Sequence, residues 1–514
     1  MASNESASPS GEANIPLLLQ DHPLPPTIPL KDGQDLAQRV WIESKKLWHV
    51  VGPSIFSRLL SYSVFILTQA SAGHLGELEL ASMSIVINVI LGFDVGLMLG
   101  MASALETLCG QAYGAKKYHM MGIYMQRSWI VLLGCCVVIL PIFLFASPVL
   151  KFLGQPSEIA ELCGVLSLWM IPLHFCLAFQ FPLWRFLQSQ LKADVIVWIC
   201  LMAVVTDIVM TWLLVHKLEL GVIGVAATIN ISWWVLTLGL LAYTVFGGCP
   251  LSWTGFSMAA FSGLWEFLKL SAASGVMLCL ENWYYRILVL MTGNLDNAQI
   301  AIDALSICMA INAWEVMIPL AFLAATGVRV ANELGAGNGK GAKFATMVSV
   351  ATSIIIGVVI CIFYMIFRNQ ISLLFSSSKP VLEEVNKLSL LLVFTILLNS
   401  VQPVLSGVAV GSGWQACVAY INLGCYYLVG LPLGFLMGWV FHLGVMGIWA
   451  GMIFGGTATQ TVILAFITTR CNWDREAEKA SLHMKKLDDQ KPKEKLILDN
   501  NNNESSRASP SPSP

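Results

Sequence analysis

About twelve apolar runs of roughly twenty residues follow one another along this 514-residue chain. A helix of ~20 residues spans the hydrocarbon core of a bilayer, and helices satisfy their own backbone hydrogen bonds there. The runs cover residues 47–70, 80–103, 124–146, 159–181, 191–215, 220–246, 268–291, 300–325, 344–367, 386–411, 416–440 and 444–469. This pattern predicts an all-α polytopic membrane protein with twelve transmembrane helices.

Charged residues are concentrated at the two ends of the chain. Lys, Arg, Asp and Glu number 60, and 27 of them fall in residues 1–46 and 470–514. The segment between them has too little charge to form the surface of a water-soluble core, because soluble domains carry ~25% charged residues. We therefore expect a disordered N-terminal tail over residues 1–46 and a C-terminal tail over residues 470–514.

Basic residues in the connections set the orientation, because cytosolic loops are rich in Lys and Arg. With the N-terminus inside, the short cytosolic connections hold Lys116, Lys117, Arg185, Lys192, Arg329, Lys340 and Lys343. The N-terminus lacks the pattern of a signal peptide. Both tails are therefore expected in the cytosol.

The chain repeats itself at an offset near 221 residues. Gln111-Ala-Tyr-Gly114 after the second run parallels Asn332-Glu-Leu-Gly335 after the eighth, and Pro182 parallels Pro403. Six spans per repeat place the two halves in the same orientation, related by an axis along the membrane normal. We expect two pseudosymmetric six-helix lobes that face a central cavity: an N-lobe over residues 47–246 and a C-lobe over residues 268–469, joined by a linker over residues 247–267.

Glu281 is the first candidate for chemistry, because a charged side chain at membrane depth costs at least ~2.5 kcal/mol and usually faces a cavity or a partner. It lies in the middle of its run, with Tyr284 and Tyr285 on the same helix face. Apolar surroundings disfavour the charged form of a carboxyl, which suits a group that takes up and releases protons. The two tyrosines are suited to stacking on an organic solute. The competing interpretation is a Glu that hydrogen-bonds a neighbouring helix for packing alone.

The eighth run supplies two more candidate proton-coupling residues, Glu315 and Asp303, with Asn312 one turn before Glu315. If Glu315 shares a cavity with Glu281, two like charges held close would make one of them bind a proton. A structural hydrogen bond is an equally good interpretation of each.

The remaining candidates are a base and two acids. Arg286 is suited to attracting an anionic solute, and it points away from Glu281 on the helix. Asp94 and Asp207 are the candidates in the N-lobe, where neither has a basic residue nearby on its own helix. Structural roles compete with function for all three.

Several function classes lack support. The net charge of −2 and the absence of a basic block argue against nucleic-acid binding. No His-Glu-x-x-His or Gly-x-Ser-x-Gly pattern occurs, and the Cys residues lack metal-binding spacing, so neither a metal site nor an enzyme is expected.

The motifs closely resemble those of the plant branch of the multidrug and toxic compound extrusion (MATE) transporters, the DETOXIFICATION proteins. The resemblance is carried by Glu106-Thr-Leu-Cys-Gly-Gln-Ala-Tyr-Gly114, Cys279-Leu-Glu281-x-Trp-Tyr, Arg329-Val-x-Asn-Glu-Leu-Gly335, the stretch from Gln402 to Gln415, and Tyr420-x-Asn-Leu-Gly-Cys-Tyr-Tyr427. It covers about residues 40–475, all but the tails.

The resemblance implies the MATE fold and the exchange of protons for organic solutes, with Glu281 as the protonation site. Some relatives have an Asp in the tenth helix opposite that Glu, where this chain has Asn399, which cannot titrate but can donate a hydrogen bond. The residues expected around the solute are Tyr284, Tyr285, Asn312, Asn399, Gln402 and Arg286.

Two functions remain as hypotheses. The leading one is an antiporter that exports or sequesters organic solutes, such as flavonoids or alkaloids, by alternating access, with H⁺ rather than Na⁺ as the coupling ion and no cofactor. The alternative is a chloride channel or uniporter on the same scaffold. We expect a monomer in the vacuolar membrane, with the plasma membrane as the alternative, and small organic solutes and membrane lipid as its partners.

Overall fold

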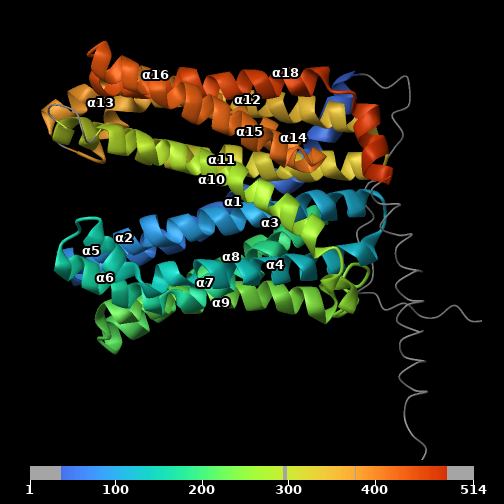
Figure 1. The fold of residues 1–514 in the computed structure, drawn as a ribbon, viewed down its shortest axis with the longest axis horizontal. Helices are drawn as coiled ribbons and strands as arrows, with labels where there is room; N and C mark the ends of the chain where they lie inside the picture. The colour runs from blue at the N-terminus through green and yellow to red at the C-terminus, as the bar shows by residue number, and fades with distance from the viewer. Residues whose placement is uncertain (1–35, 293–297, 377, 483–514) are drawn as a thin grey trace, which may run out of the picture.

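The computed structural model describes residues 36–292, 298–376 and 378–482, and the regular structure within them is helical (Figure 1). The N-lobe helices are α1 (Leu36–Leu75), α2 (Glu77–Ile85), α3 (Gly92–Gly114), α4 (Tyr118–Leu144), α5 (Ala146–Phe152), α6 (Ser157–Trp169), α7 (Ile171–Ser189), α8 (Ala193–Thr211) and α9 (Gly221–Tyr243). The C-lobe helices are α10 (Leu264–Thr292), α11 (Ala298–Gly335), α12 (Gly339–Leu373), α13 (Lys379–Asn399), α14 (Gln402–Ser412), α15 (Gln415–Asn422), α16 (Leu431–Phe435), α17 (Gly444–Met452) and α18 (Thr459–Arg470). A short 3₁₀ helix covers Met258–Phe261, and π-helical segments cover Val86–Leu91, Trp212–Lys217, Thr244–Gly248, Leu423–Gly430, Leu436–Val440 and Ile453–Ala458.

The expected multi-span membrane architecture is confirmed. In the described part of the chain, ten helical spans are long and apolar enough to cross a membrane, and several of them join consecutive segments, such as Glu77–Gly114. The pair α6 and α7, bent by 47°, makes an eleventh span. The remaining expected run, residues 268–291, is occupied by α10, which is 29 residues long. Four charged residues lie along this helix: Glu266, Lys269, Glu281 and Arg286.

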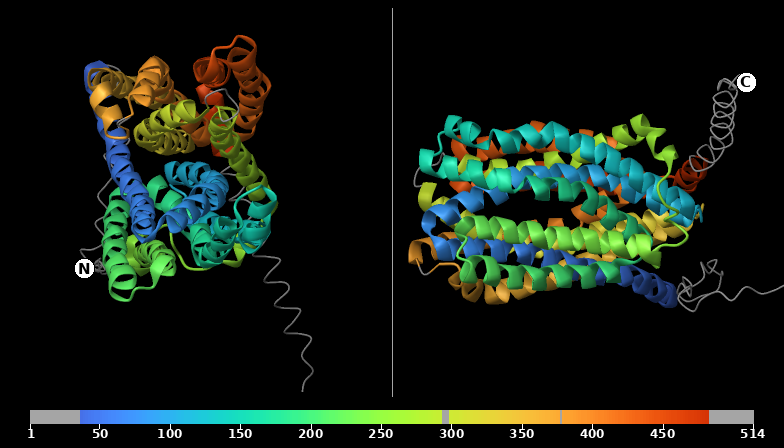
Figure 2. Two further views of the ribbon diagram at one scale, coloured as in Figure 1. Left: turned by 90° about the vertical axis from the view of Figure 1, so that its left-hand side faces the viewer. Right: turned by 90° about the horizontal axis from the view of Figure 1, so that it is seen from below.

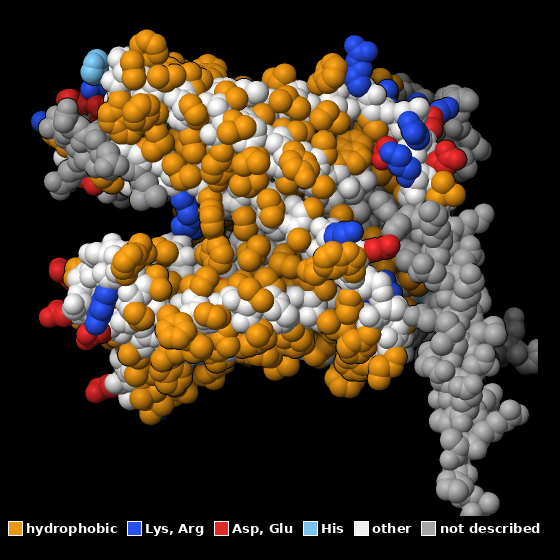
Figure 3. Space-filling model, in the orientation of Figure 1, with side chains coloured by type: hydrophobic (Ala, Val, Ile, Leu, Met, Phe, Trp, Pro, Cys, Tyr) orange, Lys and Arg blue, Asp and Glu red, His pale blue; other side chains and the backbone are white. Residues whose placement is uncertain are grey.

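The helices form two lobes that lie one above the other in Figure 1. One apolar core joins residues from α1 to the start of α10, and a second joins residues from α10 to the segment after α17. Apolar side chains cover the outer face between the two ends, and most charged side chains lie at the ends (Figure 3). This distribution is that of a bundle whose flanks face lipid.

Helix α1 connects the two lobes. It begins at Leu36, within the segment expected as the N-terminal tail, and its early residues Leu47, Val50 and Val51 pack against C-lobe residues that include Phe322. Its later residues pack in the N-lobe core (Figure 2). Residues 473–482, within the expected C-terminal tail, form a further helix that packs on the C-lobe. Residues 1–35 and 483–514 lie outside the described residues.

Both of these segments lie at the same end of the bundle, which we call the terminal end (Figures 1 and 2). Buried charged residues of α1 and α11 also meet at this end. Arg329 of α11 donates to Glu43 of α1 over 2.9 Å and to Glu333 over 2.7 Å. This bridge ties the start of α1 to the C-lobe.

The tenth span is broken in its middle. Helix α13 ends at Asn399 and α14 begins at Gln402, with Pro403 in its first turn. Proline has no N–H and disfavours helical geometry in the residue before it, so a break is expected just ahead of it. The interruption is local, because Ser400 and Val401 keep right-handed helical geometry and α13 and α14 together form one span. Asn399 and Gln402 lie on either side of it.

Candidate functional site

A cleft separates the two lobes at the end opposite the termini, and the lobes meet at the terminal end (Figure 3). Helices α3 and α10 meet along one side of the cleft, where Phe93 and Trp283 have ring centroids 5.6 Å apart. Helices α1 and α11 meet on the other side, where Tyr62 and Trp314 have centroids 5.5 Å apart. Trp283 and Trp314 remain about half exposed, so aromatic surface is available to a solute between the lobes.

Glu281 lies on α10, where its Oε2 is buried without a hydrogen-bond partner. The side chain of Gln402, at the start of α14, lies beside its carboxyl. Gln402 in turn donates to the hydroxyl of Ser406 over 3.1 Å. The broken tenth span therefore presents an amide to this acid.

Glu315, on α11, is buried with Asn399 and Asn312. The Asn399 amide donates to the Asn312 oxygen over 2.9 Å and to Glu315 Oε2 over 3.3 Å. The other Glu315 oxygen is buried without a partner. The two sides of the helix break thus serve different acids, Asn399 facing Glu315 and Gln402 facing Glu281.

Tyr285 lies close to both acids, Glu281 and Glu315. Its hydroxyl is 3.2 Å from that of Thr457, which lies in the π-helical segment Ile453–Ala458. Within the described residues, no Lys, Arg or His forms an ion pair with either acid. The C-lobe therefore holds two buried carboxyls, each with one amide neighbour, one free oxygen and no counter-cation among the described residues.

Tyr284 lies inside the C-lobe rather than at the cleft. It is fully buried, stacks on Tyr426 at 4.4 Å, and donates to the Met452 carbonyl over 2.6 Å. Tyr426 donates to Gln460, whose amide donates to Asn422, each over 2.6 Å. Sequence reasoning missed Thr457, Asn422 and Gln460, although an inventory of neutral polar residues in apolar runs would have found them.

Arg286 and Asp303 lie apart from this network. The Arg286 guanidinium reaches across to α3, so that a Cβ on Gly92 would lie 2.8 Å from its Nη2. Arg286 is exposed, and no described acid lies within ion-pair distance of it. Asp303, on α11, is exposed and makes no hydrogen bond or ion pair with a described residue.

The two N-lobe acids have partners inside that lobe. Asp94 Oδ2 lies 2.8 Å from Nδ1 of His174, on α7, and both side chains are fully buried. Asp207 accepts from Ser232 over 2.9 Å. Sequence reasoning missed His174, because its contact with Asp94 joins residues that lie 80 positions apart in the chain.

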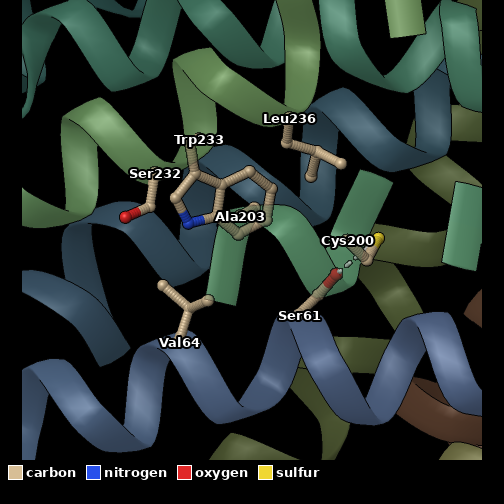
Figure 4. A pocket seen from close by; sticks show the side chains of 7 residues that line it. All are labelled: Ser61, Val64, Cys200, Ala203, Ser232, Trp233 and Leu236. Atoms are coloured by element: carbon tan, nitrogen blue, oxygen red, sulfur yellow. Dashed lines mark hydrogen bonds between the residues drawn. The ribbon is translucent and has the colours of Figure 1, made fainter. Parts of the chain in front are cut away.

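Ser232 also lines a small cavity between α1, α8 and α9 (Figure 4). Its volume is about 10 Å³, which is room for about one water molecule. The other residues around it are Ser61, Val64, Cys200, Ala203, Trp233 and Leu236. This cavity is too small for an organic solute, and the cleft is the solute site that the geometry offers.

Toward the terminal end, the cleft closes on a buried ion pair. Glu106 of α3 lies 2.7 Å from Arg185 of α7, and its carboxyl sits directly over Gly327 of α11. Arg58 of α1 is the next nearest charge. Glu106 therefore fills the space between α3 and α11 on the closed side of the cleft.

Hydrogen bonds between the lobes begin at Thr107, the next residue of α3, and continue at Gln111. Thr107 donates to the Val410 carbonyl and accepts from Gln415 over 2.7 Å. Gln111 donates to the Gly411 carbonyl over 3.3 Å. These bonds join α3 to α14 and α15 and close the cleft at the terminal end.

Helices α3 and α11 pack there through the repeated motif. A Cβ on Gly114 would overlap the Asn332 carbonyl, and one on Gly335 would overlap the Gln111 backbone. Gly114 and Gly335 are 221 residues apart, as are Gln111 and Asn332. Each copy thus makes the same contact to the other, as a two-fold axis between the lobes requires.

A protein-family model described as MatE matches residues 53–213 and 273–436 of the chain. The chain is 68% identical over 456 residues to Protein DETOXIFICATION 27 of Arabidopsis thaliana. The aligned region covers 89% of this chain and 94% of that protein. It is 61% identical over 475 residues to Protein DETOXIFICATION 26 of the same plant, covering 92% and 96%.

Solved structures show the same fold. The crystal structure of the eukaryotic MATE transporter AtDTX14 superposes with a TM-score of 0.81 at 34% identity, covering 86% of this chain and 99% of that one. The outward-facing conformation of a multidrug resistance MATE family transporter of the MOP superfamily has a TM-score of 0.75 at 17% identity, covering 85% and 97%. The two parts of the family match fall on the two lobes. The chain therefore belongs to the multidrug and toxic compound extrusion (MATE) family of transporters, among its plant DETOXIFICATION proteins.

Proposed function

We propose that this MATE transporter is an antiporter that exchanges protons for an organic solute, with Glu281 as the principal proton-binding residue. The observation that carries the proposal is the pair of C-lobe acids without a counter-cation among the described residues. A charge buried without a partner is strongly destabilising, and proton uptake removes it. Each acid has one oxygen free to hold a proton.

Protonation is coupled to solute release through the broken tenth span. Gln402 and Asn399 contact different acids, so a proton on Glu281 changes the hydrogen bonds on one side of the break and can repack α14 against α13. Helix α14 also carries Val410 and Gly411, which bond to α3 at the closed end. A change at Glu281 therefore reaches the contact that holds the lobes together.

The experiment uses sealed vesicles that contain the full chain and a panel of organic solutes, with and without a pH gradient. Wild-type chain should accumulate its solute only with the gradient, and a Na⁺ gradient should have no effect. Glu281→Gln keeps the shape of the side chain but cannot ionise, so we expect gradient-driven uptake to fall to the level of empty vesicles. Glu315→Gln should weaken uptake.

The matched control is Glu266→Gln, which removes an exposed carboxylate from the same helix. It should transport as wild type does. Coupled uptake that survives in Glu281→Gln would refute the role of Glu281, and Asp303→Asn would then test the remaining candidate on α11. Asp94 and Asp207 rank below the C-lobe acids because their partners lie within the N-lobe.

The second candidate function is an anion channel, which the exposed Arg286 favours. Closure of the cleft by α3, α11 and α14 argues against a continuous pore in this conformation. Chloride current driven by voltage across a planar bilayer, without a pH gradient, would support the channel. Currents indistinguishable from those of a protein-free bilayer would exclude the channel and favour the antiporter.

The membrane and the oligomeric state belong to the same proposal. We propose a monomer, because the two lobes of one chain supply both walls of the cleft. We also propose that it lies in the vacuolar membrane with both termini in the cytosol. A fluorescent fusion imaged against vacuolar and plasma-membrane markers tests the location.

A further inference from the structure

The cleft of this transporter carries two guanidinium groups that form no ion pair with a described acid, and we propose that its solute is an aromatic organic anion. Arg286 lies between α10 and α3, and Arg58 lies on α1 near Glu106 and Arg185. This assignment of a substrate class rests on the proposed transport function.

Arg286 lies at a depth where lipid contact is costly. Gly92, which it approaches, is the first residue of α3, and the outer end of this span is Glu77. Fifteen residues of helix correspond to ~22 Å, which places the guanidinium near the middle of a ~30 Å bilayer core. Charges at that depth face a water-filled cavity or a partner. Arg286 is exposed and forms no ion pair with a described residue. It lies against Gly92 of α3, so it faces the cleft.

Arg58 supplies positive charge deeper in the cleft. It is partly exposed and makes no hydrogen bond or ion pair within the described residues. Glu106 lies 2.7 Å from Arg185 and also interacts with Arg58. One carboxylate beside two guanidinium groups leaves one positive charge in excess. Gly92 and Glu106 are fourteen residues apart on α3, or ~21 Å along the helix. An anion that enters beside Arg286 therefore meets a second cation toward the closed end.

The aromatic part of the ligand follows from the neighbours of Arg286. Trp283 lies one turn earlier on α10, is 47% exposed, and packs beside Phe93 of α3. A planar solute can stack on this indole while its carboxylate or sulfate accepts hydrogen bonds from the guanidinium, which presents donors in a fork that matches such groups. The acids Glu281 and Glu315 add no net charge when they are protonated.

Equilibrium binding to the purified full chain tests the inference without relying on transport. Three fluorescent probes share one ring system: the glucoside, the glucuronide and the sulfate of 4-methylumbelliferone. The first is neutral and the other two are anionic. Wild-type chain should bind the two anions about tenfold more tightly than the glucoside, which corresponds to ~1.4 kcal/mol.

The variants are Arg286→Gln, Arg286→Lys and, as the charge-matched control, Lys217→Gln, which removes an exposed cation from another helix at the open end. Arg286→Gln should lose the preference for the anions and keep glucoside binding. Arg286→Lys, which keeps the charge, should retain most of the preference, and Lys217→Gln should retain all of it. Equal affinity of wild-type chain for the three probes, or an unchanged preference in Arg286→Gln, would overturn the inference.

Transport of the same probes separates the two proposals. If the anions bind selectively but no probe is driven by a pH gradient, proton coupling fails and the anion site stands. If a gradient drives the glucoside as well as the anions and binding shows no preference, the antiporter stands and the anion site fails.

Discussion

A single hydrogen-bond acceptor determines the number of protons that the Asp94–His174 pair carries. Nε2 of His174 lies 3.0 Å from the Cys136 carbonyl oxygen, and a carbonyl can only accept, so Nε2 carries a proton. One further proton lies between Nδ1 and Asp94. The pair is therefore neutral overall, whether that proton sits on the acid or on the imidazole, and it joins α3, α4 and α7 as a structural tie.

This proton count predicts different outcomes for two substitutions of Asp94. Asp94→Asn supplies an N–H to Nδ1 of a neutral His174, so we expect near-wild-type thermal stability in detergent and retained pH-driven transport. Asp94→Leu leaves Nδ1 buried without a partner, which costs ~1–3 kcal/mol, and should lower the melting temperature. Loss of coupling in a stable Asp94→Asn protein would show that Asp94 takes part in proton transfer.

The identity of the C-lobe acids could be predicted from the sequence, because an acid within an apolar run has few alternatives to a cavity or a partner. Glu281 and Glu315 follow from this rule, whereas Asn399 follows from the family resemblance. Their pairing with particular amides was not predictable, because it depends on where α11, α13 and α14 cross. The same is true of His174, and Tyr284 was expected at the cleft although the structure places it in the lobe interior.

At the scale of helices, the closed end is held by close backbone packing of α3 against α11 and by hydrogen bonds from α3 to α14 and α15. Thr107 is central, since its hydroxyl both donates to Val410 and accepts from Gln415. Alternating access requires these bonds to break when the terminal end opens. Their strength therefore contributes to the balance between the two conformations.

Thr107→Val tests this contribution, because it removes the hydroxyl and keeps the volume. Two lost bonds of ~1 kcal/mol each should shift the conformational ratio roughly 30-fold toward opening at the terminal end. The measurement is the rate at which an impermeant reagent labels a cysteine introduced at Gln111 from the terminal side. Thr107→Ser, which keeps the hydroxyl, should label at the rate of the parent, and equal rates in all three would contradict the prediction.

The helices themselves were largely predictable, because the length of an apolar run reports the thickness of the bilayer. Pro403 signalled the break between α13 and α14. Other features left no local signal. The π-helical segments and the start of α1 at Leu36 depend on packing between helices, as in the contact of Leu47 and Val50 with the C-lobe, and apolar periodicity does not report such contacts.

The whole molecule is open at one end and closed at the terminal end, which predicts sided chemical labelling. Trp283→Cys lies in the cleft and should react with an impermeant maleimide only from the side opposite the termini. Lys340→Cys, at the exposed α11–α12 turn, should react only from the terminal side. Both would be made with Cys417→Ser, which removes an exposed native thiol. Labelling of Trp283→Cys from the terminal side alone would show that the opposite conformation dominates in membranes.

The reciprocal contact between α3 and α11 has the form of an interface between two copies of one unit. A surface that meets its own copy has the geometry of a two-fold interface, and the packing of Gly114 on Asn332 and of Gly335 on Gln111 reproduces that geometry within one chain. Glu106 and Gly327 occupy equivalent positions 221 residues apart and touch each other. In identical subunits two glutamates, or two glycines, would have faced one another at that point. In this chain the two halves can differ, so one side carries a carboxylate and the other is the space that receives it.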